Sequence, residues 1–409
     1  SDEGGSGVKR IRKPDGIWAT GTSTTYTATD NGTYNFVVED NAGNTATVSA
    51  VVSNIDRIPP TGTYSLNPAT WTNQNVVITF IASDEGGSGV KRIRKPDGIW
   101  VTDISTTYIV ASNGIYDFVV EDNAGNTTTI SAIVSNIDKI APEGIFTPDS
   151  STWTKENVTV TFDPSDEGGS GVKQWRYRVS GDNGSTWDAW SSYILGDTNG
   201  TINLAEQGIW KIQVEVSDNA GNVSIVDSGA YLIDKTPPGG TYTPNSSSWT
   251  KENIVVTFDP LDEGGSGVKQ WRYRVSGDNG STWSAWSEYI LGDANGTINL
   301  TLQGVWTIQA EVTDNASNVG YVNSDIYHID KQLPGGSFMP NSSAWTNQDI
   351  AAIFTPSDEG GSGVKQWRYR VSSDNGNTWG TWSDYVLGNA NGTIILTSQG
   401  LCLIQAEVT

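Results

Sequence analysis

The residues best placed to do chemistry in this sequence are acidic pairs that recur in a fixed motif. The octapeptide DEGGSGVK begins at Asp2, Asp84, Asp166, Asp262 and Asp358. Two adjacent carboxylates followed by small residues fit three kinds of site: a tight turn, a loop that binds a metal ion, or part of a catalytic site.

Two other motifs place further acids at the same rhythm. A junction motif, NIDRIPP in its first copy, carries an aspartate at Asp56, Asp138, Asp234 and Asp330. Each lies 28 residues before the next DEGG aspartate. A third motif, DNAGN, begins at Asp40, Asp122 and Asp218, and its variant DNASN begins at Asp314. Acids that keep such a register are expected to have one structural role repeated along the chain.

The composition excludes several classes of function. The chain has 46 acidic against 24 basic residues and a net charge of -22, which argues against nucleic-acid binding because phosphates need cations. One histidine and one cysteine leave no room for histidine-based catalysis, histidine-rich metal sites or intramolecular disulfides. No apolar run is long enough for membrane insertion in this segment.

The spacing of the motifs predicts tandem domains. Successive DEGGSGVK copies are 82, 82, 96 and 96 residues apart, which is the size of a small domain and longer than a solenoid repeat. We expect five domains: 1–56 (N-terminally incomplete), 57–138, 139–234 and 235–330 (both long forms), and 331–409 (C-terminally incomplete).

Within a unit the sequence reads as all-β. Residues 75–82 (NVVITFIA), 90–94 (VKRIR), 114–122 (GIYDFVVED) and 127–138 (TTTISAIVSNID) are rich in β-branched residues and are expected to be strands B, C, F and G. In residues 210–216 (WKIQVEV), apolar and polar residues alternate as in a half-buried antiparallel strand. About seven strands per unit predict antiparallel Ig-like β-sandwiches, arranged as an elongated rod stiffened by proline-containing linkers.

The chain also resembles bacterial extracellular Ig-like or fibronectin-III-like repeats. The residues that carry the resemblance are IDKTPP at 233–238, SGVKQWRYRVSGDNGSTW at 170–187 and GIWKIQVEVSDNAGN at 208–222. The resemblance implies a secreted or bacterial cell-surface protein in which such domains serve as stalks and spacers. It names no ligand, because a fold does not fix a function.

Standard Ig strand order brings the acidic motifs together. The B–C loop (DEGG), the F–G loop (DNAGN) and the preceding linker lie at one end of a sandwich. The candidate interdomain Ca²⁺ ligands are therefore Asp56, Asp84, Glu85 and Asp122 at the first joint; Asp138, Asp166, Glu167 and Asp218 at the second; Asp234, Asp262, Glu263 and Asp314 at the third; and Asp330, Asp358 and Glu359 at the fourth. Ca²⁺ takes six to eight such oxygens.

Two alternatives to calcium stay open. Aspartates cap turns without any metal. Asp84 or Asp122 are also candidates to pair with Lys91 or with the basic junction residues Arg57, Lys139, Lys235 and Lys331. The loop does not match the acid spacing of an EF-hand.

A second motif, S-x-D-x-G-x-T-W, begins at Ser180, Ser276 and Ser372 and is similar to the Asp-box of sialidases. That resemblance implies a hairpin turn in which aspartate caps amides, glycine adopts positive φ and tryptophan packs beneath. The arginine cluster and nucleophilic tyrosine of a sialidase are not recognisable, so no catalytic site and no enzyme are predicted.

The 17 tryptophans allow two interpretations. Trp71, Trp153, Trp249 and Trp345 are expected to fill the core or support turns, and the arginines of QWRYR to stack on neighbouring aromatic rings. Exposed pairs such as Trp187/Trp190 and Trp283/Trp286 would instead suit glycans. Cys402 aligns with Trp210 and Trp306 and is expected to be a buried thiol.

These observations predict a non-enzymatic stalk or fibre segment, with neighbouring copies of itself or cell-surface or matrix components as partners. Two alternatives remain: an adhesin that binds glycans or matrix through exposed tryptophan, and a subunit of a self-assembling extracellular filament or surface layer. Beyond Ca²⁺ at the joints no cofactor is expected.

Overall fold

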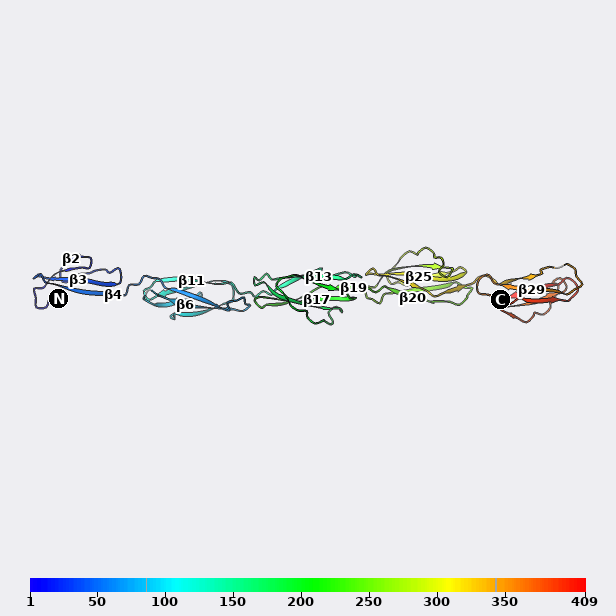
Figure 1. Cartoon of the computed structure of the whole chain (residues 1–409), viewed down its shortest axis with the longest axis horizontal. Coiled ribbons are helices and arrows are strands. Elements are labelled where there is room, and N and C mark those ends of the chain that lie inside the picture. The colour runs from blue at the N-terminus through cyan, green and yellow to red at the C-terminus, as the bar shows by residue number, and fades with distance from the viewer. Residues whose placement is uncertain (86, 343) are drawn as a thin grey trace.

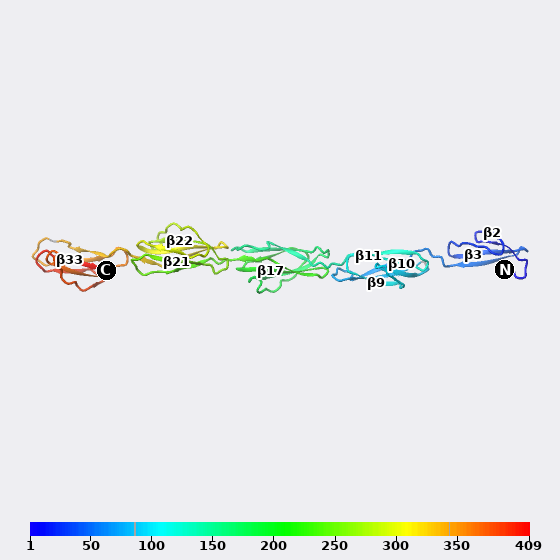
Figure 2. The same cartoon turned by 180° about the vertical axis from the view of Figure 1, so that it is seen from behind.

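The computed structural model describes residues 1–85, 87–342 and 344–409. Strands are the only regular elements in these residues, and no helix occurs among them. The strands form successive groups that follow one another end to end in a single row, as Figures 1 and 2 show from opposite sides. We call the five groups units 1 to 5 in chain order.

Unit 2 shows the shared plan in its short form. Its strands are β5 (Thr61–Asn67), β6 (Val76–Ser83), β7 (Val90–Arg94), β8 (Trp100–Val101), β9 (Ser105–Val110), β10 (Gly114–Asp122) and β11 (Thr127–Val134). One antiparallel sheet has the order β5-β6-β9 and the other β11-β10-β7-β8. These orders correspond to A-B-E against G-F-C-C′, the arrangement of an Ig-like or fibronectin-III-like sandwich.

Units 3 and 4 repeat this plan in a long form. Unit 3 comprises β12 (Glu143–Thr147), β13 (Val158–Ser165), β14 (Val172–Ser180), β15 (Ile194–Leu195), β16 (Gly200–Leu204), β17 (Gly208–Asp218), β18 (Val223–Asp227) and β19 (Tyr231–Ile233). Unit 4 comprises β20 (Gly239–Thr243), β21 (Ile254–Leu261), β22 (Val268–Ser276), β23 (Ile290–Leu291), β24 (Gly296–Leu300), β25 (Gly304–Asp314), β26 (Val319–Asn323) and β27 (Tyr327–Ile329). The added strands β19 and β27 pair with the first residues of strands β17 and β25.

The outer units contain fewer strands. Unit 1 is one sheet of the order β2-β1-β3-β4, formed by β1 (Val8–Arg12), β2 (Trp18–Thr20), β3 (Gly32–Asp40) and β4 (Thr45–Val52). Unit 5 has two three-stranded sheets, formed by β28 (Gly335–Met339), β29 (Ile350–Ser357), β30 (Gln366–Ser372), β31 (Val386–Leu387), β32 (Gly392–Leu396) and β33 (Leu403–Val408).

Each complete unit has its own core between the two sheets. In unit 3 the core centres on Trp175, which is fully buried against Phe162. Gly200 makes room for this ring, because a Cβ at that position would lie 2.4 Å from the indole. Trp271 and Gly296 form the same pair in unit 4. In units 3 and 4 the glycine of the N-G-T segment thus serves core packing.

The predicted fold class is confirmed: the chain is all-β and built of antiparallel Ig-like sandwiches. Val90–Arg94 and Gly114–Asp122 form strands with the expected bounds, whereas the expected G strand of 127–138 ends at Val134. No hydrogen-bonded sheet in the described residues combines strands from two of the expected domain ranges. The exact boundaries of the domains stay a prediction.

Candidate functional site at the joints between units

The aspartates of the three acidic motifs meet where one unit follows another. At the first three joints the clusters are Asp56/Asp84/Asp122, Asp138/Asp166/Asp218 and Asp234/Asp262/Asp314. In each cluster one carboxylate oxygen per residue lies within 4.8 Å of the other two. The B–C loop, the F–G loop and the linker therefore do share one end of the sandwich, and nine of the fifteen candidate ligands lie in these clusters.

The carboxylates of these clusters also cap turns. At the third joint, Asp314 accepts hydrogen bonds from the backbone N–H and side-chain amide of Asn318, both at 2.8 Å. Asp262 accepts the backbone N–H of Gly267 at 2.7 Å. Asp234 accepts the N–H of Ser266 at 3.2 Å across the joint. Turn capping is thus realised, and it fixes the positions of the carboxylates that face one another.

Three of the lysines that one alternative paired with these aspartates make other contacts. Lys91 pairs with Glu121 at 2.6 Å. The junction lysines reach back into the preceding unit instead: Lys139 donates to Asn75 and to the carbonyl of Ala111, and Lys235 contacts Asn157 in the same manner. Asp138 and Lys139 are adjacent in the chain, yet Asp138 accepts the N–H of Ser170 in the following unit while Lys139 contacts the preceding one. Among the described residues no ion pair involves the aspartates of the second and third clusters.

The third cluster contains an aspartate whose pKa is raised. Burial raises the pKa of Asp314 above its ordinary value, and the nearby carboxylates of Asp234 and Asp262 add to the rise. Oxygens bound to one Ca²⁺ at 2.3–2.6 Å lie at most about 5 Å apart, so the observed separations fit a shared cation. Binding of a metal ion at these joints stays a prediction.

The six candidate ligands outside these clusters are the four loop glutamates and the two aspartates of the fourth joint. Glu85, Glu167, Glu263 and Glu359 are exposed and outside the clusters, because in each loop the aspartate faces the joint and the glutamate faces solvent. At the fourth joint Asp330 and Asp358 share the hydroxyl of Ser362, whose hydrogen bond holds the pKa of Asp330 below its ordinary value. This joint gathers two aspartates.

Tryptophans of the WT motif also lie at the joints, which corrects the expectation that they fill the core. They belong to the A–B loop, at the end of each unit that faces the next one. Trp71, Trp153 and Trp249 approach Gly169, Gly265 and Gly361 of the following unit, where an added Cβ would lie 3.8, 3.4 and 2.7 Å from the indole. Trp345, in unit 5, is 85% exposed. A repeated tryptophan looks the same in a sequence whether it packs within a unit or between units.

Sequence reasoning missed further contacts across the joints. Gln207 and Gln303 donate to the carbonyls of Gly264 and Gly360 at 3.0 and 3.2 Å. Asn318 donates to the carbonyl of Asp234 at 2.8 Å, and Asn222 does the same to Asp138 at 2.9 Å. The repeated last asparagine of DNAGN was the available signal for these bonds.

The predicted stacking of arginine on aromatic rings forms a ladder in each long unit. In unit 3 the order is Trp187, Arg178, Trp190, Arg176, Tyr193, with guanidinium-to-centroid distances of 4.6–5.0 Å. Units 4 and 5 repeat it around Trp286 and Trp382. Two guanidinium groups lie over each of these central rings, which reduces the ring surface left for stacking a sugar.

The Asp-box forms the expected hairpin. Asp182 accepts the N–H of Thr186 at 2.8 Å, Gly184 has φ +89°, and Trp187 lies against that glycine. Hydrogen bonds from Thr186, its side chain first, lower the pKa of Asp182 to about 2. A carboxylate held in this way is a structural acceptor.

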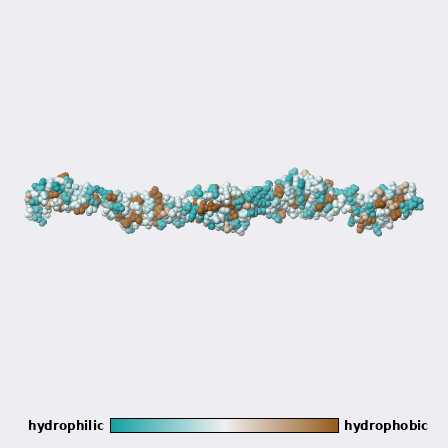
Figure 3. All heavy atoms as spheres, viewed as in Figure 1, coloured by the Kyte–Doolittle hydropathy of each residue, from teal (hydrophilic) through white to brown (hydrophobic). Residues whose placement is uncertain are grey.

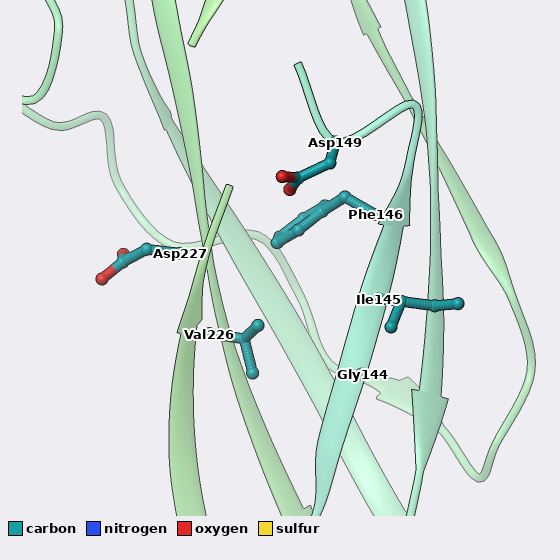
Figure 4. A pocket seen from close by; sticks show the side chains of 6 residues that line it. All are labelled: Gly144, Ile145, Phe146, Asp149, Val226 and Asp227. Atoms are coloured by element: carbon teal, nitrogen blue, oxygen red, sulfur yellow. The ribbon is translucent and has the colours of Figure 1, made fainter. Parts of the chain in front are cut away.

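Small hollows also occur along the sandwiches. Figure 4 shows one between β12 and β18, lined by Phe146, Val226, Asp149 and Asp227 among others. Its volume of about 210 Å³ is below that of a typical ligand pocket. Along the row, hydrophobic patches are interspersed with hydrophilic surface (Figure 3). No helix in the described part of the chain offers an apolar stretch that would cross a bilayer.

Comparisons with known proteins found partial matches. No family model matches the chain. Exoglucanase B of Cellulomonas fimi is 30% identical over 275 residues, which cover 57% of this chain and 24% of that protein. Similar solved structures are domains A168-A170 of titin (TM-score 0.27, 11% identity, 66% of this chain and 98% of that one) and the Clostridium thermocellum CbhA fibronectin(III)-like modules (TM-score 0.20, 10% identity, 44% and 87%). The strand order described above carries the assignment to Ig-like or fibronectin-III-like repeats.

Proposed function

We propose that this chain is a non-enzymatic spacer, a rod segment of a bacterial cell-surface or secreted protein. The observation that carries the proposal is the tryptophan-on-glycine contact, which is repeated at three successive joints. Flexible linkers leave neighbouring domains free to reorient, whereas here side chains of one unit pack against loops of the next. Contacts of this kind hold the units in line.

The remaining features support the same role. The acidic, cysteine-poor composition and the family resemblance suit a secreted protein. The match to Exoglucanase B covers a quarter of that protein, so the activity in its name is not carried over to this chain. The arginine-covered rings of Trp190 and Trp286 speak against the adhesin alternative at those positions.

Small-angle X-ray scattering tests the spacer function. The wild-type chain is expected to scatter as a straight rod with one maximum dimension. A variant with Trp71→Ala, Trp153→Ala and Trp249→Ala is expected to give a broader, shorter distance distribution. Trp345→Ala is the matched control, because that ring is 85% exposed and covers no following loop. A triple variant as extended as the wild type would contradict the proposal.

We further propose that Ca²⁺ binds at the first three joints. The supporting observation is the close approach of three aspartates at each, two of them buried at the second and third joints. Free Ca²⁺ at a hundred times its dissociation constant would stabilise a joint by about 2.7 kcal/mol. The melting temperature is therefore expected to fall when EDTA is added.

The variant Asp314→Asn separates calcium binding from turn capping. The variant keeps the bond from the backbone N–H of Asn318 and loses the bond from its side-chain amide, while it removes one of three neighbouring negative charges, so in EDTA it is expected to melt close to the wild-type temperature. With Ca²⁺ it is expected to lose the stabilisation of the third joint. If Ca²⁺ changes neither the melting temperature nor the length of the wild-type chain, the joints are held without metal.

A further inference from the structure

The edge strand β9 of unit 2 has one side without a neighbouring strand. It pairs with β6 in the sheet β5-β6-β9, and no other strand of the described residues lies beside it. A strand in this position presents backbone N–H and C=O groups to which a further strand can bond. Addition of a strand at such an edge is a recurrent way for two chains to associate.

The other three edge strands of unit 2 are protected. Strand β5 is flanked by Pro60 and Pro68, and proline has no N–H to offer to a further strand. Strand β8 has only two residues. Strand β11 lies against β5, where the hydroxyl of Tyr64 accepts the N–H of Ile133 at 3.2 Å. Of the four edges, β9 is therefore the one most open to strand addition.

The sequence around β9 contains none of the residues that usually block such pairing. Residues 104–113 (ISTTYIVASN) include no charged residue and no proline. Ile109 is 64% exposed on the outer face of the strand. Asn203 and Asn299 stand at the equivalent register in units 3 and 4, and Ile395 stands there in the shorter strand of unit 5. Because the sandwich accepts asparagine at this position, packing within the unit does not explain the isoleucine.

The distribution of charge favours contact between copies at unit 2. The whole chain has a net charge of -22, so two copies repel each other. Residues 57–138 carry five basic and eight acidic side chains, whereas residues 139–234 carry six and fourteen and residues 235–330 carry five and eleven. The repulsion between two copies is therefore weaker at unit 2 than at units 3 and 4.

The outer face of β9 complements itself when two copies run antiparallel about Thr107. Ser105, Thr107 and Ile109 alternate on this face. Antiparallel pairing centred on Thr107 sets Ile109 of each copy opposite Ser105 of the other. Within one copy, Ser105 lies opposite Ile81 of β6. The small serine thus leaves room for Ile109 of one copy to approach Ile81 of the other.

We propose that two copies of this chain associate through β9, with Thr107 at the two-fold axis. The result is one continuous antiparallel sheet of the order β5-β6-β9-β9-β6-β5. Backbone hydrogen bonds between the two copies of β9 supply affinity, and the cross-strand pairs of Ile109 with Ser105 set the register. The inference goes beyond the spacer role, because it joins two rods side by side and does not depend on the contacts at the joints.

Sedimentation equilibrium of the full chain tests the association, in EDTA so that calcium does not contribute. The wild-type chain is expected to show a concentration-dependent equilibrium between monomer and dimer. Ile109→Asn is expected to raise the dissociation constant of the dimer by roughly tenfold or more, since two isoleucines leave the contact. This variant should keep its fold, because units 3 and 4 carry asparagine at the same register.

Two further variants are matched controls. Ile115→Asn changes a side chain of unit 2 that is 68% exposed on β10, in the other sheet. Ile395→Asn makes the equivalent change in unit 5. Both are expected to leave the dissociation constant unchanged.

A disulfide measures the register directly. In a Cys402→Ser background, Thr107→Cys brings two cysteines opposite each other across the two-fold axis. The Cα atoms of such a pair lie about 4.5–5.5 Å apart, within the range of a disulfide. Oxidised glutathione accepts the two electrons and protons of the thiols. Thr63→Cys, exposed on β5 of the same sheet, reports random collision and is expected to cross-link much more slowly.

Three results would overturn the proposal. The first is a wild-type chain that stays monomeric at millimolar concentration. The second is a control variant that weakens the dimer as much as Ile109→Asn does. The third is equal cross-linking of Thr107→Cys and Thr63→Cys.

Discussion

The first and fourth joints use the same glycine in different surroundings. Gly87 and Gly361 occupy the same place in the DEGGSG loop and share a φ of +110°. A Cβ on Gly87 would meet nothing within 4 Å, whereas one on Gly361 would lie 2.7 Å from the indole of Trp249. The φ angle of this glycine is therefore the same at both joints. The difference between the two glycines is the indole of Trp249, which comes from the A–B loop of the preceding unit and lies against Gly361.

The largest change is expected from removing that tryptophan. Trp249→Ala uncovers the loop of unit 5 and should cost the fourth joint about 2 kcal/mol, from the loss of a partly buried aromatic ring. Amide hydrogen exchange in residues 358–364 should then accelerate roughly 30-fold. Residues 87–91 provide an internal reference in the same sample, since no tryptophan covers them. Unchanged exchange in residues 358–364 would show that the ring does not stabilise the joint.

Substituting alanine for Gly87 and for Gly361 compares the packing around the same loop position at the first and fourth joints. Gly87→Ala and Gly361→Ala share the cost of a positive φ, about 1 kcal/mol. Gly361→Ala also forces the alanine against Trp249, with an expected further cost of about 1–3 kcal/mol. Thermal melting of the two variants measures the difference. Equal losses would contradict close packing at the fourth joint.

A smaller effect is expected from the glutamine. Gln303→Ala removes its hydrogen bond to the carbonyl of Gly360 and should cost about 1 kcal/mol, or roughly fivefold faster exchange at the fourth joint. Gln207→Ala should act in the same way at the third joint only. Effects that spread equally to both joints would indicate a general loss of stability.

The smallest expected effect is the pH dependence of the stability that two aspartates contribute. The pKa of Asp314 is raised by burial, so its contribution to stability grows as pH falls through that pKa and is lost as pH rises. The pKa of Asp330 is lowered by Ser362, so its contribution is present above the ordinary aspartate range and is lost as pH falls. Carboxyl carbon NMR titration should find Asp314 titrating above Asp330, and the reverse order would contradict the assigned surroundings.

The sequence was most informative where one residue type serves one purpose. Richness in β-branched residues, together with the strand order of an Ig-like sandwich, predicted the strands at 90–94 and 114–122, because such side chains suit a half-buried pleated surface. The convergence of the aspartates followed from strand order alone. The sequence did not reveal that Trp71 packs between units while Trp175 fills a core, because both positions repeat and both rings bury apolar surface. Cys402 was misjudged because its cover in units 3 and 4 comes from a strand that has no equivalent in the described part of unit 5.

The most direct test of the central claim is a distance measurement across two joints. Pairs of spin labels at Lys9→Cys and Lys91→Cys span the first joint, and equivalent pairs at Lys269→Cys and Lys365→Cys span the fourth, in a Cys402→Ser background with EDTA. All four positions are exposed. The account predicts a narrow distance distribution across the fourth joint, a broader one across the first, and broadening of the fourth by Trp249→Ala. Distributions of equal width that Trp249→Ala leaves unchanged would contradict it.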